Sequence, residues 1–168
     1  QESRGLGDVY KRQEQVEVII HPQSIVHSMV EFLDGSVLAQ LGRPDMRLPI
    51  QYAILAPERP GNTFDRLDWT QAMSMDFHPV DLGRFPCLRL AYEAARRGGT
   101  ATTALNAANE VANAAFLRGG VRFGEIARTV EWVLERHIPV AADSLATVEE
   151  ADTDARELAR QYLGCATD

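Results

Sequence analysis

The chain has 168 residues, of which 45% are hydrophobic and 24% are charged, proportions typical of a globular protein and not of a disordered one. Its formal net charge of −7 argues against nucleic acid as a partner, because that partner requires a basic face. No apolar run approaches the roughly 20 residues that cross a bilayer, so we expect a soluble, cytoplasmic protein with no membrane partner. Cys87 and Cys165 lie far apart in sequence; reduced thiols are expected, and a disulfide between them stays open.

Residues 1–13 have neither helical nor strand periodicity, and Gly5 and Gly7 disfavour a helix. The string SRGLGDVYKRQ within them is similar to translated adapter sequence. We therefore expect residues 1–13 to be extraneous to the fold, with a flexible native lead-in as the alternative.

Residues 14–58 have the pattern of short strands followed by a helix. A β-branched apolar run from Val16 to Ile20, ended by Pro22, predicts a buried strand. Residues 48–55 predict a short helix, because Pro49 is tolerated in a first helical turn.

Between these two elements, residues 26–41 predict a β-hairpin with Asp34-Gly35 as a two-residue turn. The turn sets the register of the two strands and hence the residues on each face. One face should be apolar and pack inward, with three cross-strand pairs: Phe32 opposite Val37, Val30 opposite Ala39 and Ser28 opposite Leu41.

Prolines and glycines interrupt residues 59–85, which predicts an extended linker that lies across a surface. From residue 86 onward, apolar residues recur at helical spacing in four stretches, near residues 88–95, 105–116, 126–137 and 152–163. Asp152 is the expected N-cap of the last helix. The short connections predict a four-helix bundle over residues 86–168. The predicted fold class is therefore α+β: a strand and hairpin over residues 14–58, a linker over 59–85, and the bundle.

Two histidines near the hairpin are candidates for chemistry. His21 and His27 are six residues apart, which does not match the spacing of a helical zinc pair. His27 alone could serve as a hydrogen-bonding or proton-transfer group, with a purely structural histidine as the alternative. Ser24 has no base beside it in sequence, so nothing supports a nucleophile there.

The loop Gly-Arg-Pro-Asp-Met-Arg over residues 42–47 could form one wall of a pocket. Gly42 permits unusual backbone angles, Pro44 stiffens the turn, and Met46 offers an adaptable apolar surface. A plain connecting turn is the alternative. Further along, helical spacing places four polar residues on one face: Asn106, Asn109, Glu110 and Asn113. Glu110 is the best candidate for a buried acid, with structural hydrogen bonds to loop backbone as its expected role.

Two long stretches, IIHPQSIVHSMVEFLDGSVLAQLGRPDMRLPIQYA and ATTALNAANE, resemble the 1-deoxy-D-xylulose 5-phosphate reductoisomerase family. Enzymes of this family convert deoxyxylulose phosphate to methylerythritol phosphate by NADPH-dependent isomerisation and reduction, on the non-mevalonate route to isoprenoids. The resemblance implies an N-terminal NADPH domain, a central α/β catalytic domain with the divalent metal, and a C-terminal helical bundle. This chain resembles only the end of the catalytic domain (residues 14–58), the linker and the bundle.

The resemblance also implies site residues. Ser24, Pro44 and Met46 would bind substrate, His27 would lie beside the pocket in a catalytic role, and Met46 would lie near the nicotinamide. None of the family's metal ligands matches a residue of this chain. NADPH and Mg²⁺ or Mn²⁺ are therefore expected in the intact enzyme and not on this chain alone.

Several further expectations follow from the resemblance. The isolated chain should be inactive, the phosphosugar substrate should be held largely by upstream residues, and the intact enzyme should be a cytoplasmic homodimer. The alternative reading is a non-catalytic helical interaction module.

Overall fold

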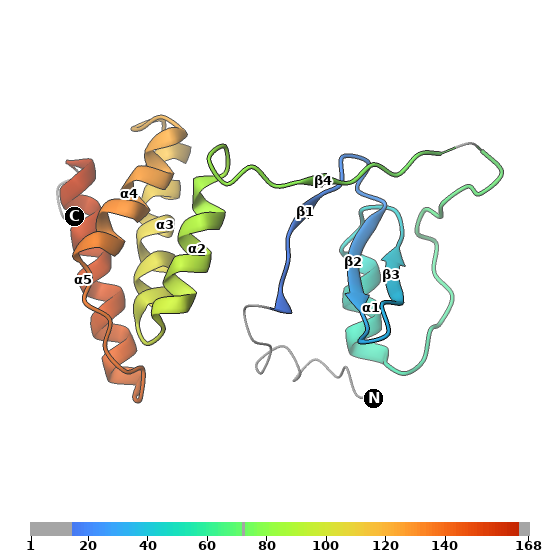
Figure 1. The fold of residues 1–168 in the computed structure, drawn as a ribbon, viewed down its shortest axis with the longest axis horizontal. Helices are drawn as coiled ribbons and strands as arrows, with labels where there is room; N and C mark the ends of the chain where they lie inside the picture. The colour runs from blue at the N-terminus through green and yellow to red at the C-terminus, as the bar shows by residue number, and fades with distance from the viewer. Residues whose placement is uncertain (1–14, 72, 165–168) are drawn as a thin grey trace. The chain divides into compact units, whose positions relative to one another are not determined.

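A computed structural model of the chain describes residues 15–71 and 73–164 (Figure 1). Residues 1–13, expected to be extraneous, and Cys165 of the possible disulfide lie outside these described residues. The contacts divide the chain into two compact units, Val18–Val80 and the residues from Asp81 onward together with the segment that ends at Glu17. Among the described residues, no helix is both long and apolar enough to cross a membrane.

The unit Val18–Val80 contains two small antiparallel sheets and one helix. A long-range sheet pairs β1 (Ile19–Ile20) with β4 (His78–Pro79), and the hairpin pairs β2 (Val26–Glu31) with β3 (Val37–Leu41). The helix α1 spans Arg47–Leu55, as the sequence predicts, with none of its residues buried. The predicted buried strand is wrong: β1 has only two residues, and Val16 and Val18 are exposed.

The hairpin forms where the sequence predicts it, but its register is shifted by one residue. Glu31 pairs with Val37, and the loop has three residues, Leu33 to Gly35, because Phe32 donates its N–H to the Ser36 carbonyl at 2.9 Å. The Asp34 carboxylate accepts hydrogen bonds from the backbone N–H and hydroxyl of Ser36, which draws Ser36 opposite Phe32. Gly35, at φ +81°, takes the left-handed angle that ends such a loop.

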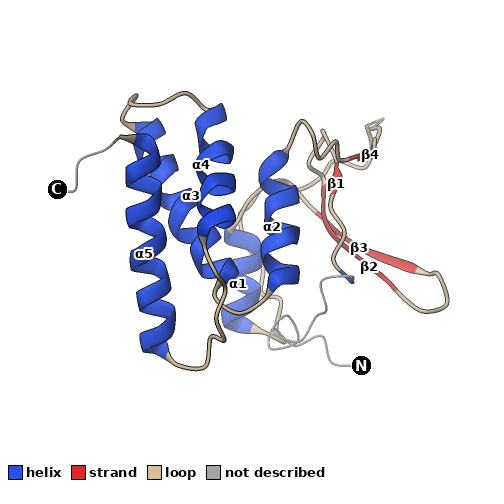
Figure 2. Cartoon of the chain, turned by 60° about the vertical axis from the view of Figure 1, so that its left-hand side comes forward, coloured by secondary structure: helices blue, strands red, loops and turns tan. Residues whose placement is uncertain are grey.

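The observed register changes which residues share a face. The observed pairs are Met29 with Ala39, Val30 with Leu38 and Ser28 with Gln40. The expected inward-packing apolar face is also wrong, since Val30 and Val37 are 54% and 50% exposed. Within this unit, β2 and β3 pair only with each other, as the two-stranded ribbon in Figure 2 shows.

The second unit is the predicted bundle of four helices (Figures 1 and 2). The helices are α2 (Pro86–Arg97), α3 (Ala101–Leu117), α4 (Gly124–Arg136) and α5 (Leu145–Leu163). The central helix is α3, which packs against each of the other three. All of its buried residues are alanines, and they meet larger side chains such as Leu90, Val133 and Leu134. Small side chains on α3 allow its neighbours to approach closely.

The last helix begins earlier than the sequence predicts. The N-cap of α5 is Ser144, whose hydroxyl accepts a hydrogen bond from the Thr147 N–H at 3.1 Å. Asp152, the expected N-cap, lies in the middle of the helix and pairs with Arg156 at 2.6 Å. Most of the residues between the two positions are good helix formers, namely leucine, alanine and glutamate, so the helix extends back to the first available cap.

A buried polar contact joins the connection after α4 to the turn between α2 and α3. Thr100 is fully buried, and its hydroxyl lies 2.9 Å from Nε2 of His137 and accepts the Val140 N–H at 3.2 Å. The Thr100 N–H donates to the Val140 carbonyl at 2.9 Å. Because the threonine oxygen already accepts one hydrogen bond, its proton is free to go to a neutral His137.

Acidification should weaken the bundle through His137. Burial lowers the pKa of His137 below its ordinary 6.5, and Arg97 adds to this effect against an opposing contribution from Asp154. The unfolded chain then binds a proton more readily than the folded one. The contribution of His137 to the free energy of unfolding should therefore be fully present above a pH of about 6.5 and be lost as the pH falls below it. Denaturant unfolding followed by helical circular dichroism between pH 5.5 and 8 should show this slope.

The matched variant for this test is His137→Gln, whose amide oxygen can still accept the Thr100 hydroxyl proton but does not titrate. It should flatten the pH dependence, whereas His78→Gln, in the other unit, should leave the slope unchanged. If the free energy of unfolding of the His137→Gln variant depended on pH as steeply as that of the unsubstituted chain, the assignment of this dependence to His137 would be wrong.

Candidate functional site

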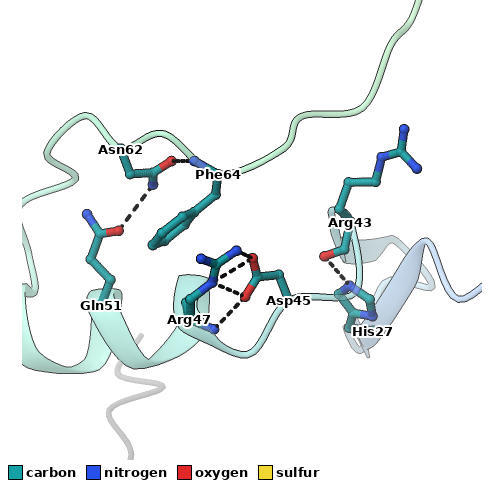
Figure 3. Close-up of polar contacts among 7 residues, drawn as sticks. All are labelled: His27, Arg43, Asp45, Arg47, Gln51, Asn62 and Phe64. Atoms are coloured by element: carbon teal, nitrogen blue, oxygen red, sulfur yellow. Dashed lines mark hydrogen bonds and ion pairs between the residues drawn. The ribbon is translucent and has the colours of Figure 1, made fainter.

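His27 lies at an irregularity in the hairpin. Val26 pairs with Leu41 and Ser28 with Gln40, so His27 is an extra residue on β2, as in a β-bulge. Bulges redirect side chains and are common beside active sites. Nε2 of His27 lies 3.4 Å from the Arg43 carbonyl oxygen (Figure 3). A proton on Nε2 would be donated to that carbonyl, leaving Nδ1 as an exposed proton acceptor.

Ser24 has an unusual backbone conformation. Its φ is +49°, in the left-handed region that side chains other than glycine rarely adopt. Its N–H donates to the His21 carbonyl at 3.1 Å and closes a turn over Pro22 and Gln23. Strained residues of this kind cluster at ligand-binding sites and persist only where neighbouring contacts hold them. The exposed Ser24 hydroxyl is therefore held at the end of a fixed turn.

The loop over residues 42–47 is organised by a charged pair that the sequence analysis did not single out. Two side-chain nitrogens of Arg47, Nε and Nη2, donate hydrogen bonds to the Asp45 carboxylate at 2.6 to 3.0 Å. The backbone N–H of Arg47 donates to the same carboxylate (Figure 3). The Arg47 hydrogen bonds lower the pKa of Asp45. The Asp-Met-Arg spacing was the available signal, because an Asp side chain readily caps the N–H two residues on.

This pair leaves the other loop residues free to face outward. Pro44 is exposed and the Met46 side chain is 72% exposed, at the N-cap position of α1. An apolar side chain on a braced loop suits the wall of a pocket, but an Asp side chain that caps the N–H two residues on is also common in a plain connecting turn, so the pocket wall stays a prediction.

The start of the linker packs on α1 and supports the loop from behind. Gln51 donates to the Pro60 carbonyl at 3.3 Å. It also accepts from the Asn62 amide at 3.1 Å, and Asn62 accepts the Phe64 N–H (Figure 3). The Phe64 ring lies 4.5 Å from the Arg47 guanidinium, a cation–π contact. Ser24, His27, Pro44 and Met46 therefore all lie in one unit, with the loop braced by residues outside the predicted set.

The metal-binding capacity of the described residues is limited. Within residues 15–71 and 73–164, no group of three or more His, Cys, Asp or Glu side chains is placed to hold a metal ion. His21 uses Nδ1 to hydrogen-bond the Asp76 carbonyl, and His27 faces Arg43. These residues do not fit a metal centre by themselves.

The polar face of α3 differs from expectation at Glu110. This residue is exposed, so its assignment as a buried acid is wrong. It contacts side chains, not loop backbone: its carboxylate accepts from Arg156 at 2.6 Å and from Asn106 at 3.1 Å. The Arg156 hydrogen bond is the main reason that the pKa of Glu110 is lowered. The physical reason is that α3 turns its alanine face into the bundle, which leaves Glu110 on the surface.

Comparison with known proteins identifies the family. Residues 41–158 match the family model described as the DXP reductoisomerase C-terminal domain, where DXP is 1-deoxy-D-xylulose 5-phosphate. The chain belongs to this family, as the sequence resemblance implies. The reductoisomerase of Cupriavidus pinatubonensis is 59% identical over 150 residues, and that of Nitrosococcus oceani 52% over 149. The alignments cover 89% of this chain and 38% of each relative, so the chain spans little more than a third of their length.

Solved structures agree with the sequence matches. The reductoisomerase of Zymomonas mobilis in complex with NADPH is 44% identical, with a TM-score of 0.81 over 89% of this chain and 40% of that one. A second reductoisomerase, in complex with magnesium, is 40% identical, with a TM-score of 0.79 over 87% and 39%. A third similar structure holds NADPH, fosmidomycin and magnesium. The α+β assignment is confirmed.

Proposed function

We propose that this chain forms the C-terminal part of a DXP reductoisomerase, which converts deoxyxylulose phosphate to methylerythritol phosphate. The observation that carries the proposal is the extent of the match: one relative is 59% identical over 89% of this chain, and the family model matches residues 41–158. A module selected only for helical packing would have no need of the strained Ser24, the bulged His27 and the braced loop, all of which the packing of the bundle leaves unexplained.

The proposed roles come from the family resemblance, and the exposure of these side chains supports them. His27 presents an imidazole whose free nitrogen can accept or return a proton, and Ser24 presents a hydroxyl that can hydrogen-bond substrate. Pro44 and Met46 form an apolar wall, with Met46 against the nicotinamide. Each of these side chains is exposed in the chain by itself, as a group that completes a pocket with other residues would be.

Cofactor and metal would be held by residues outside this chain. Related structures contain NADPH and magnesium, but the described residues do not fit a metal centre. When bound, NADPH would supply hydride, and Mg²⁺ or Mn²⁺ would polarise substrate oxygens. We propose that the chain alone binds neither and has no reductoisomerase activity, and that the intact enzyme is a cytoplasmic homodimer acting on a phosphosugar.

A chimera tests the proposal. The upstream part of the Cupriavidus pinatubonensis enzyme would be joined to this chain in place of its own C-terminal portion. We expect substrate-dependent oxidation of NADPH by the chimera within about tenfold of the parent enzyme, because the substituted part is 59% identical. The isolated chain, assayed beside it, should give none.

The controls separate the proposal from its rival. The parent enzyme without its C-terminal portion shows whether this part is needed at all. A chimera that is folded and dimeric but inactive would contradict the proposal and favour the non-catalytic interaction module. Activity in the isolated chain would contradict the prediction that the upstream residues are required.

A further inference from the structure

The turn that carries Ser24 is fastened to a segment more than fifty residues further along the chain. Nδ1 of His21 lies 2.8 Å from the Asp76 carbonyl oxygen. The Gln23 amide group binds Asp76 twice: its nitrogen donates to the Asp76 carboxylate, and its oxygen accepts the Asp76 N–H at 3.2 Å. The pairing of β1 with β4 runs directly beside these contacts.

An aromatic contact fixes the same turn from a second direction. The His21 ring stacks on Phe77, with ring centroids 4.7 Å apart and an angle of 20° between the planes. Nδ1 must carry a proton to bond the Asp76 carbonyl, and Nε2 is buried without a hydrogen-bond partner among the described residues. One hydrogen bond and one stacked ring therefore set the orientation of His21.

The contacts bear directly on the strained residue. The carbonyl that accepts the Ser24 N–H belongs to His21 itself, so any movement of His21 moves Ser24. A left-handed serine needs surrounding contacts that outweigh its strain. Within this unit, His21 and Gln23 provide those contacts through Asp76 and Phe77.

We infer that His21, Gln23 and Asp76 are positioning residues that hold Ser24 in the conformation that binds substrate. We call these three residues the clasp. The inference rests on the proposed function, since it deepens the role given there to Ser24. It makes residue 76, which lies outside the motifs that resemble the family, a determinant of substrate affinity.

The kinetic test uses the chimera described above. Asp76→Ala removes the acceptor for Gln23 and should raise the KM for deoxyxylulose phosphate about fivefold to tenfold, with kcat and the KM for NADPH changed less than about twofold. Asp76→Asn keeps an oxygen for Gln23 and should restore a KM near that of the unsubstituted chimera. In a Ser24→Ala background, Asp76→Ala should raise the KM no further, because the residue it positions is gone.

The matched control is Asp68→Ala. Asp68 is an exposed aspartate in the same linker; its carboxylate accepts hydrogen bonds from Thr70 and Gln71 and attracts Arg43, and none of these residues belongs to the clasp. It should leave the KM unchanged. An Asp76→Ala variant with an unchanged KM, or with an additive effect in the Ser24→Ala background, would overturn the inference.

A second measurement on the chain itself separates this inference from the proposed function. Amide hydrogen exchange at Ser24 should accelerate about tenfold in Asp76→Ala, because the turn can then open locally. Exchange at Gly35, whose N–H closes the distant hairpin loop, should not change. If the chimera is inactive but Ser24 exchange accelerates, the proposed function fails and the clasp stands. If Ser24 exchange is unchanged, the clasp is wrong whatever the chimera does.

Discussion

Replacing Gly99 by alanine should lower the free energy of unfolding of the helical bundle by roughly 2–4 kcal/mol, because a methyl group there is both strained and overpacked. Gly99 lies between α2 and α3 at φ +53°, an angle that alanine adopts only with strain. An added Cβ would also overlap the carbonyl oxygen of Val140, which is the acceptor for the Thr100 N–H. Denaturant unfolding followed by circular dichroism measures the loss.

Gly164 is the matched control for this prediction. It follows α5 in the left-handed region, at φ +65° and ψ +20°, and has open space around the position of a Cβ. Gly164→Ala should therefore incur only the backbone strain, about 1 kcal/mol. If the two variants lost the same free energy of unfolding, the close contact with the Val140 carbonyl would not be the cause of the loss at Gly99.

Replacing His27 by glutamine should lower the kcat of the chimera about a hundredfold or more, as expected for loss of a proton-transfer group. The glutamine amide can still donate to the Arg43 carbonyl, so the tie between β2 and the loop is kept. Steady-state rates with saturating NADPH and substrate give kcat directly. Because His27 is exposed, the melting temperature should change little.

His78→Gln is the control for the histidine substitution. His78 is also exposed and lies in β4 of the same unit, but it has no place in the proposed pocket. Its rate should match that of the unsubstituted chimera. A kcat within threefold of that value for His27→Gln would assign His27 to structure and leave Ser24, Pro44 and Met46 as the proposed pocket residues.

The helices could be predicted because their signals are local. Gly98 and Gly99 end one helix and Pro139 follows another, so the breaks between apolar stripes were visible in the sequence. The start of α5 was missed because Ser144 and Asp152 are both good N-caps, and the choice between them depends on packing along the whole helix.

The hairpin shows the limit of a local rule. Asp34-Gly35 favours a two-residue turn, but hydrogen bonds from Ser36 to the Asp34 side chain bring a third residue into the loop. That single residue shifts each predicted pair. The bulge at His27 then moves the strands one residue further from the expected alignment, because Leu41 pairs with Val26 and not with Ser28, which no turn rule predicts.

The candidate site could be predicted in part. His27 and the loop were identifiable because they interrupt apolar runs, whereas Ser24 became a candidate only through the family resemblance. Their supports were not, because Asp76 and Phe77 approach the turn from more than fifty residues away and follow no periodic pattern. Whether the named residues bind substrate stays a prediction.

The all-alanine interior face of α3 has a consequence for the entropy of folding. Alanine has no side-chain rotamers to lose, so burying six of these residues costs no side-chain conformational entropy. A face of leucines would bury more apolar area but would have to restrict each side chain to one rotamer. The bundle therefore gains order at its centre mainly through the close approach of rigid backbones. Its helices should accordingly resist small rearrangements while tolerating few enlargements of the side chains along α3.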